Sequence, residues 1–107
     1  MMAASDRTAF AIGLAQTSAP GTVWAYNNSA DQTLERVLEK ATGEDVVTFA
    51  KERLFDPLGM TETTLTRDKS GHAQLFEGAT SSCRDMARFG QLLLNDGKWG
   101  TKQIVSP

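Results

Sequence analysis

Several residue types are scarce in this chain of 107 residues, which has one cysteine, one histidine, one tyrosine and no long hydrophobic run. With Cys83 as the lone thiol, no internal disulfide can form, and such a thiol suits the cytosol without excluding the periplasm. No apolar stretch approaches the ~20 residues that cross a bilayer. The start, Met1 to Arg7, lacks a basic region followed by an apolar stretch and does not read as a signal peptide.

An excess of charge of one sign is also missing. Eleven Lys and Arg stand against 13 Asp and Glu, a net charge of -2. The basic residues are spread along the chain, so no basic patch for nucleic acid is expected. The His, Cys, Asp and Glu residues show no metal-ligand spacing, and neither a metal nor another cofactor is predicted. His72, beside Gly71, is interpreted as a solvated loop residue.

The hydrophobic periodicity predicts a mainly α chain with three to four helices and one short strand. Helices are expected over residues 5–16, 29–43, about 44–57 and 82–95, and the strand over 22–26. Ser5 or Asp6 would cap the first helix, and Ser29 with Gln32 forms a capping-box pattern for the second. Gly43 would end that second helix in the left-handed conformation. Ser82 would cap the last helix.

The apolar residues at helical spacing are expected to form the buried faces of these helices. The turn at residues 57–60 also carries apolar residues and is expected to pack beneath them. The faces predicted to be buried are Leu34, Val37, Leu38 and Ala41; Val46, Phe49, Ala50 and Leu54; and Met86, Phe89, Leu92 and Leu93.

The most informative stretch runs from Pro20 to Asn28, with the sequence Pro-Gly-Thr-Val-Trp-Ala-Tyr-Asn-Asn. A turn leads into an aromatic strand that ends on Tyr26 directly before a helix. A strand-to-helix junction can aim polar groups into a cleft. From the residues alone, Tyr26 could equally be a strand tyrosine packing on Trp24, and Asn28 a helix N-cap.

This stretch, read as Pro-Gly-Thr-x-Trp-x-Tyr-x-Asn, resembles the second motif of the serine β-lactamase-like hydrolases. That family includes class C β-lactamases, penicillin-binding-protein-like esterases and 6-aminohexanoate-dimer hydrolases. The resemblance covers roughly residues 8–107 and rests on several segments in the expected order and spacing. The later segments that resemble the family are residues 39–43 (Glu-Lys-Ala-Thr-Gly), 55–60 (Phe-Asp-Pro-Leu-Gly-Met), 82–93 and 97–107.

The resemblance implies a role for the residues of this stretch. In the family a serine and a lysine share one helix face as Ser-x-x-Lys, and the tyrosine of Tyr-x-Asn lies beside them. A tyrosine with an ordinary pKa of about 10 becomes a useful base only when a neighbouring cation lowers that pKa. By analogy Tyr26 would be the general base or proton shuttle, Asn28 would orient the substrate carbonyl or the lysine, and Trp24 would contact substrate.

The chain also departs from the family pattern. It contains neither Ser-x-x-Lys nor the third motif, Lys-Thr-Gly or His-x-Gly. Glu35 stands where relatives often carry a small residue, which would alter packing beneath the site if its side chain faces inward. Ser106-Pro107 reads as the opening of a further helix. We therefore interpret residues 1–107 as part of a β-lactamase-like domain, the helical subdomain of a parent α/β fold with an antiparallel sheet.

Two functions follow from this interpretation. The first is part of a serine hydrolase that cleaves small-molecule esters or amides, β-lactams included, through an acyl-serine, with the isolated chain inactive. An esterase or amide hydrolase is favoured over a true β-lactamase. Such a part would expose apolar faces and self-associate. The second is a stand-alone helical binding module that keeps the fold and lacks the chemistry.

Overall fold

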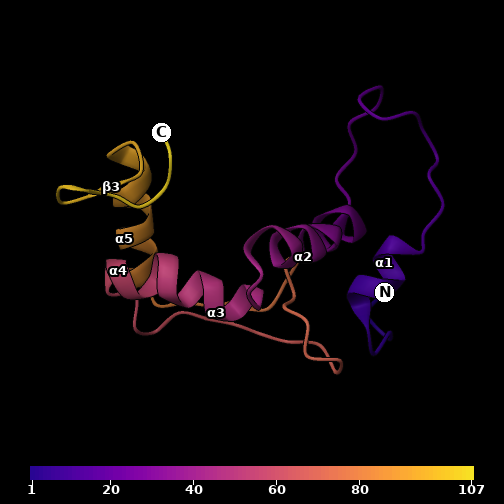
Figure 1. Ribbon diagram of the computed structural model, residues 1–107, viewed down its shortest axis with the longest axis horizontal. Coiled ribbons are helices and arrows are strands. Elements are labelled where there is room, and N and C mark those ends of the chain that lie inside the picture. Colours follow the sequence, from indigo (N-terminus) through magenta and orange to yellow (C-terminus); the bar gives the residue numbers. More distant parts are fainter.

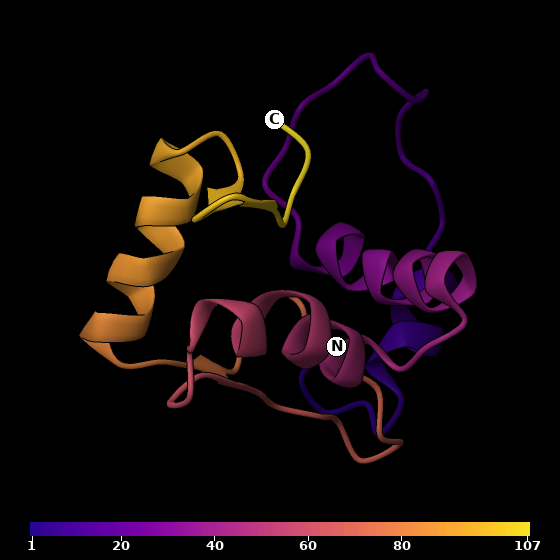
Figure 2. The same cartoon turned by 60° about the vertical axis from the view of Figure 1, so that its left-hand side comes forward.

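The computed structural model describes residues 1–107 as an open arc of helices, 44 × 33 × 27 Å in extent (Figure 1). α1 (Arg7–Ile12) packs on α2 (Asn28–Thr42) at one end. A continuous helical run follows, made of α3 (Val46–Ala50), the π-helical turn η1 (Lys51–Phe55) and α4 (Asp56–Leu58). α5 (Cys83–Leu94) stands at the other end of the arc (Figures 1 and 2).

Two short antiparallel pairs of strands complete the fold. β1 (Thr64–Leu65) pairs with β2 (Ala79–Thr80), Thr64 opposite Thr80. β3 (Lys98–Trp99) and β4 (Lys102–Gln103) form a hairpin that folds back on α5. Gly97 makes this return possible, because a Cβ there would lie 2.1 Å from the Val105 carbonyl oxygen. Its positive φ of 76° is also one that glycine adopts without strain.

The hydrophobic core lies between the helical run and α5. Its centre is Phe55, Leu58, Met60 and Leu92. The predicted packing of the turn at 57–60 is confirmed, since Leu58 and Met60 are both buried. Around this centre pack the half-buried residues Ala50, Leu54, Leu65, Phe89, Trp99 and Ile104.

The helix termini follow the sequence in most places. Asp6 caps α1, accepting the Ala9 N–H at 2.8 Å. Gly43 ends α2 with a φ of 71°, and its N–H donates to the Glu39 carbonyl. Ser82 caps α5, its hydroxyl accepting the Asp85 N–H at 3.2 Å. The mainly helical fold class is confirmed, although α1 is shorter than the predicted 5–16.

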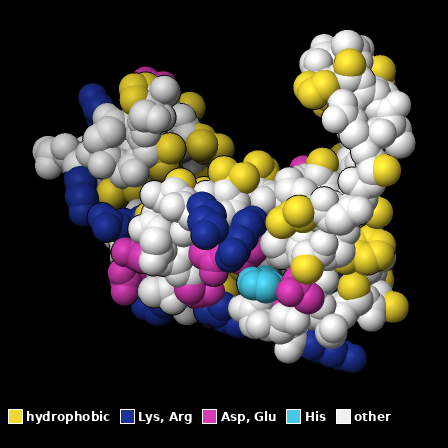
Figure 3. Space-filling view, turned by 45° about the vertical axis from the view of Figure 1, so that its right-hand side comes forward, with side chains coloured by type: hydrophobic (Ala, Val, Ile, Leu, Met, Phe, Trp, Pro, Cys, Tyr) yellow, Lys and Arg dark blue, Asp and Glu magenta, His cyan; other side chains and the backbone are white.

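The predicted strand over residues 22–26 is wrong. These residues form no strand and belong to a loop, residues 13–27, that stands out from α1 and α2 (Figures 1 and 3). A strand needs a neighbour to satisfy its N–H and C=O groups, and this chain places none beside it. Strand-favouring side chains alone do not replace that pairing.

The helix faces predicted to be buried are only partly so. Val46 and Leu92 are buried and Phe89 is half-buried, as expected. Leu34, Val37, Met86 and Leu93 are instead more than half exposed. Amphipathic periodicity identifies a face that seeks apolar contact, and here no element covers these faces. Hydrophobic side chains accordingly gather on the surface at the α1–α2 end (Figure 3).

Candidate functional site

The segment with the family motif lies at the junction of the projecting loop and α2. Tyr26 is 77% exposed and precedes the cap of the helix. Its hydroxyl takes part in none of the side-chain hydrogen bonds within the chain. Trp24 is 87% exposed and packs on nothing that would fix its ring. The alternative of a strand tyrosine packed beneath a tryptophan therefore has no counterpart in the structure.

The N-cap of α2 is Asn27, and the prediction of Ser29 as the cap is wrong. The Asn27 side-chain oxygen accepts the Ser29 N–H at 2.9 Å and the Ala30 N–H at 3.2 Å. The Asn27 side chain stands two and three residues before these N–H groups and can reach them. Ser29 already lies within the helix and cannot take the cap position. Asn28 is thus the first helical residue and its side chain is not needed as the cap. The cap holds the backbone between Tyr26 and Asn28.

A buried polar cluster lies beneath α2. Gln32 donates from Nε2 to the Thr8 hydroxyl at 2.9 Å and to the Ala73 carbonyl at 2.8 Å, and its Oε1 accepts the Leu75 N–H at 3.0 Å. Glu35 faces inward, with 1% exposure and a hydrogen bond from Thr8, which is the condition under which its charge was expected to alter packing beneath the site. Sequence periodicity missed this cluster because it assigns polar side chains to the solvent side.

A second buried carboxylate, Asp85, joins α5 to the chain before β1. It accepts the Glu62 N–H at 2.8 Å and the Thr63 hydroxyl at 2.9 Å, and it pairs with Arg88 at 2.9 Å. Burial alone would raise the pKa of this carboxyl, but these donors outweigh burial and leave the pKa below its ordinary value. Asp85 is therefore a structural anion.

A third polar group gathers Asp6, Asp68 and His72, with one potential ligand atom from each inside 4.8 Å. The interpretation of His72 as a solvated residue is wrong, since it is half-buried and its Nδ1 lies 3.3 Å from Asp6 Oδ1. Both carboxylates already serve the backbone. Asp68 accepts N–H groups of Arg7, Ser70 and His72 at 2.8–3.0 Å, which outweigh its burial and lower its pKa. The cluster thus fixes a turn against α1.

The structure has no helix that is both long and apolar enough to cross a membrane.

Comparison with known proteins gives the family. A family model described as Beta-lactamase matches residues 3–105, nearly the whole chain. The chain therefore belongs to the beta-lactamase family. The order of the segments in the sequence agrees with this assignment.

The chain is also similar to two solved structures and to one curated protein. It is similar to "Putative 6-aminohexanoate-dimer hydrolase from Bacillus anthracis", with 38% identity, a TM-score of 0.80, and coverage of 86% of this chain and 24% of that one. It is also similar to "putative beta-lactamase from Bacteroides dorei DSM 17855", with 26% identity, a TM-score of 0.79, and coverage of 94% and 32%. A lovastatin esterase of Penicillium rubens is 43% identical over 44 residues, 41% of this chain and 11% of that protein.

Proposed function

We propose that this chain supplies the Tyr26–Asn28 segment to the acyl-transfer site of a serine hydrolase that cleaves esters or amides. Residues 1–107 would form the helical part of the domain, and they span about a quarter to a third of the similar solved structures. The reaction would pass through an acyl-serine, with Tyr26 as general base or proton shuttle and Asn28 orienting the substrate carbonyl or the lysine.

One observation carries this proposal. Tyr26 is exposed with an uncommitted hydroxyl, while the adjacent Asn27 cap holds its backbone at the start of α2. A residue kept for packing would be buried, and a residue kept for capping would be bonded. A lovastatin esterase and a 6-aminohexanoate-dimer hydrolase among the similar proteins support an ester or amide substrate, and a putative beta-lactamase among them keeps the β-lactam within the proposed class.

A chimera tests the proposal. Residues 8–107 would replace the matching segment of the Bacillus anthracis protein, and hydrolysis of p-nitrophenyl acetate would be measured. The Tyr26→Phe chimera is expected to lose roughly 100-fold or more in kcat, the usual contribution of a positioned acid or base. Val23→Ala, a change at another exposed position of the same loop, serves as control. Equal kcat for Tyr26→Phe and the parent chimera would remove Tyr26 from the chemistry.

For the chain by itself we propose no acyl-enzyme chemistry, because it contains no Ser-x-x-Lys. Incubation with p-nitrophenyl acetate or a β-lactam would leave its intact mass unchanged. A stoichiometric acyl adduct on a serine would contradict this.

The second candidate is a stand-alone helical binding module, and the exposed apolar faces provide a way to tell it from part of a hydrolase. Phe10, Ile12 and Leu14 near α1 and Leu34 and Val37 on α2 are all more than 40% exposed. A module would be monodisperse and unfold cooperatively by itself, whereas part of a hydrolase would self-associate through these faces. Light scattering across a concentration series, together with urea unfolding, separates the two.

A further inference from the structure

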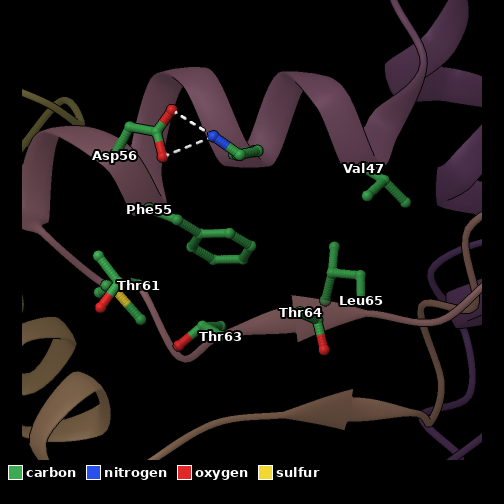
Figure 4. A pocket seen from close by; sticks show the side chains of 9 residues that line it. Val47, Phe55, Asp56, Thr61, Thr63, Thr64 and Leu65 are labelled. Atoms are coloured by element: carbon green, nitrogen blue, oxygen red, sulfur yellow. Dashed lines mark hydrogen bonds and ion pairs between the residues drawn. The ribbon is translucent and has the colours of Figure 1, made fainter.

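A cavity of about 370 Å³ lies between the helical run α3–η1–α4 and strand β1, on elements other than those that carry Tyr26 (Figure 4). It falls within the 300–1,000 Å³ typical of small-molecule sites. A closed apolar cavity of about 150 Å³ already holds benzene. There is thus room for an aromatic ring with a short substituent.

The inner wall of the cavity is apolar. The Phe55 ring projects from the helix towards β1, and Val47 and Leu65 face each other at the far end (Figure 4). Met60 also lines the cavity, and both Phe55 and Met60 belong to the buried core. The wall is therefore backed by the best-packed part of the molecule and is preformed.

The polar rim of the cavity comes from the π-helical turn. In a π-helix the backbone bonds join residues five apart, which brings such residues onto one face. Lys51 and Asp56 are five apart, and the Lys51 Nζ contacts both Asp56 carboxylate oxygens, at 2.9 and 2.7 Å. π-Helical turns are rare and frequently occur at functional sites. Here the turn places both the ion pair and Phe55 on the cavity.

The ion pair at the rim is more than half exposed on both sides, so it favours one class of ligand by a modest margin. Lys51 and Asp56 neutralise each other, so a ligand with a single charge would have to divide the pair or face the like charge. An uncharged amide can instead donate to the Asp56 carboxylate and accept from the Lys51 ammonium with the pair intact. The Thr63 hydroxyl is already engaged by Ser81 and Asp85. Thr61 at the exposed edge offers a further hydroxyl.

We propose that this cavity is a binding site for a small aromatic or aliphatic molecule with one uncharged amide group. The site is independent of the acyl-transfer residues. The apolar part of the ligand lies against Phe55 and Met60, and its amide meets Lys51 and Asp56 at the rim.

The probe for this site is N-benzylacetamide, titrated into the ¹⁵N-labelled chain and followed by amide chemical shifts. Saturable shifts are expected at residues 47–65, with a dissociation constant in the millimolar range that suits a ligand of this size. Val47→Phe fills the cavity and should weaken binding roughly tenfold or more. Val37→Phe makes the same change on the exposed face of α2 and should leave binding unchanged.

Two further measurements keep the proposal open to refutation. Thr61→Phe places a ring at the exposed edge without touching the core, so it tests occupancy even if Val47→Phe does not fold. Phenylacetate and benzylammonium carry opposite charges on a similar aromatic scaffold, and each should bind several-fold more weakly than N-benzylacetamide. Non-saturable shifts, shifts centred on α1 and α2, or unchanged affinity in both cavity variants would overturn the site. Tighter binding of either ion would overturn the ligand class.

Discussion

At the α5 end of the molecule Leu58 and Leu92 are almost completely buried among other apolar side chains. At the α1 end the largest buried side chains, Gln32 and Glu35, are polar, and Gln32 joins α2 to both α1 and the chain near Ala73. Arg7 adds an ion pair to Glu77 at 2.6 Å. The α5 end is therefore held mainly by non-directional apolar contact, with Asp85 as its one buried carboxylate. The α1 end is held mainly by hydrogen bonds that must keep their geometry.

This contrast explains where apolar side chains remain in contact with water. The α1–α2 pair uses its polar face for internal contact, which leaves Leu34 and Val37 pointing outward. A helix pair that buries its polar side has a strong preference for one arrangement and gains little from hydrophobic burial. The motif segment at Tyr26 is attached to this end, so its position depends on those hydrogen bonds.

The largest expected effect comes from Leu92→Ala in the apolar core. Leu92 is 0% exposed, and truncation of a buried leucine costs about 2–5 kcal/mol. Urea unfolding measures the loss. Leu94→Ala is the matched control, since Leu94 is 78% exposed and should change the free energy by less than about 0.5 kcal/mol. Similar losses for the two variants would mean that the core is not where the structure has it.

Gln32→Ala should destabilise the α1 end instead, because it removes the hydrogen bonds of the Gln32 side chain. It leaves the Ala73 carbonyl and the Leu75 N–H without their partner, and an unsatisfied buried group costs about 1–3 kcal/mol. Hydrogen exchange should accelerate at Leu75 and in α1, with little change in α5. Gln91→Ala, which removes an exposed glutamine bonded only to Asn95, is the control. Uniform acceleration over the whole chain would contradict two separately held ends.

Asn27→Ala tests the cap that holds the motif segment. Two first-turn N–H groups lose their acceptor, and the expected cost is about 1 kcal/mol. Asn27→Asp keeps the acceptor and should restore the wild-type stability. Circular dichroism and urea unfolding report the outcome. An alanine variant as stable as the wild type would show that the cap does not fix this junction.

The smallest effect is expected for the ion pair between Asp45, at the start of α3, and Arg67, in the chain after β1. The Arg67 guanidinium is the main cause of a pKa of Asp45 far below its usual range. A lowered folded-state pKa contributes stability above the ordinary value near 4 and loses it as the pH falls further. Both side chains are more than a third exposed, so Asp45→Asn should cost only about 0.2–1 kcal/mol at neutral pH.

Stability measured between pH 7 and pH 2 checks this prediction. The acid-induced loss should be smaller in Asp45→Asn than in the wild type, and high salt should reduce the difference. A variant with an identical acid profile would show that the pair contributes nothing.

The sequence was sufficient wherever local chemistry decides the structure. Gly43, Ser82 and the turn at residues 57–60 were predicted because helix ends and tight turns depend on neighbouring residues. The family motif at Tyr26 was likewise visible as a local pattern. Contacts between distant segments were not. Gln32 reaches Ala73 across 41 residues, and no periodicity in α2 indicates that its polar side is the buried one.

Two errors have a common physical origin. The strand over 22–26 and the burial of the apolar faces of α2 and α5 were both predicted from the preferences of their own residues. Whether such preferences are satisfied depends on what lies opposite. The cavity near Phe55 was not predicted for a different reason. It depends on a π-helical turn, and the sequence pattern does not distinguish such a turn from ordinary α-helix.

The polar contact between α1 and α2 also gives the two ends of the molecule different responses to temperature. Exposure of apolar surface raises the heat capacity, and exposure of polar surface lowers it. Release of α1 breaks the hydrogen bonds of its Thr8 hydroxyl to Gln32 and Glu35 and uncovers mainly polar groups, so its heat-capacity change should be small. Apolar contact weakens on cooling, whereas these hydrogen bonds do not depend on it. In the cold, the core around Leu92 should loosen before α1 leaves α2.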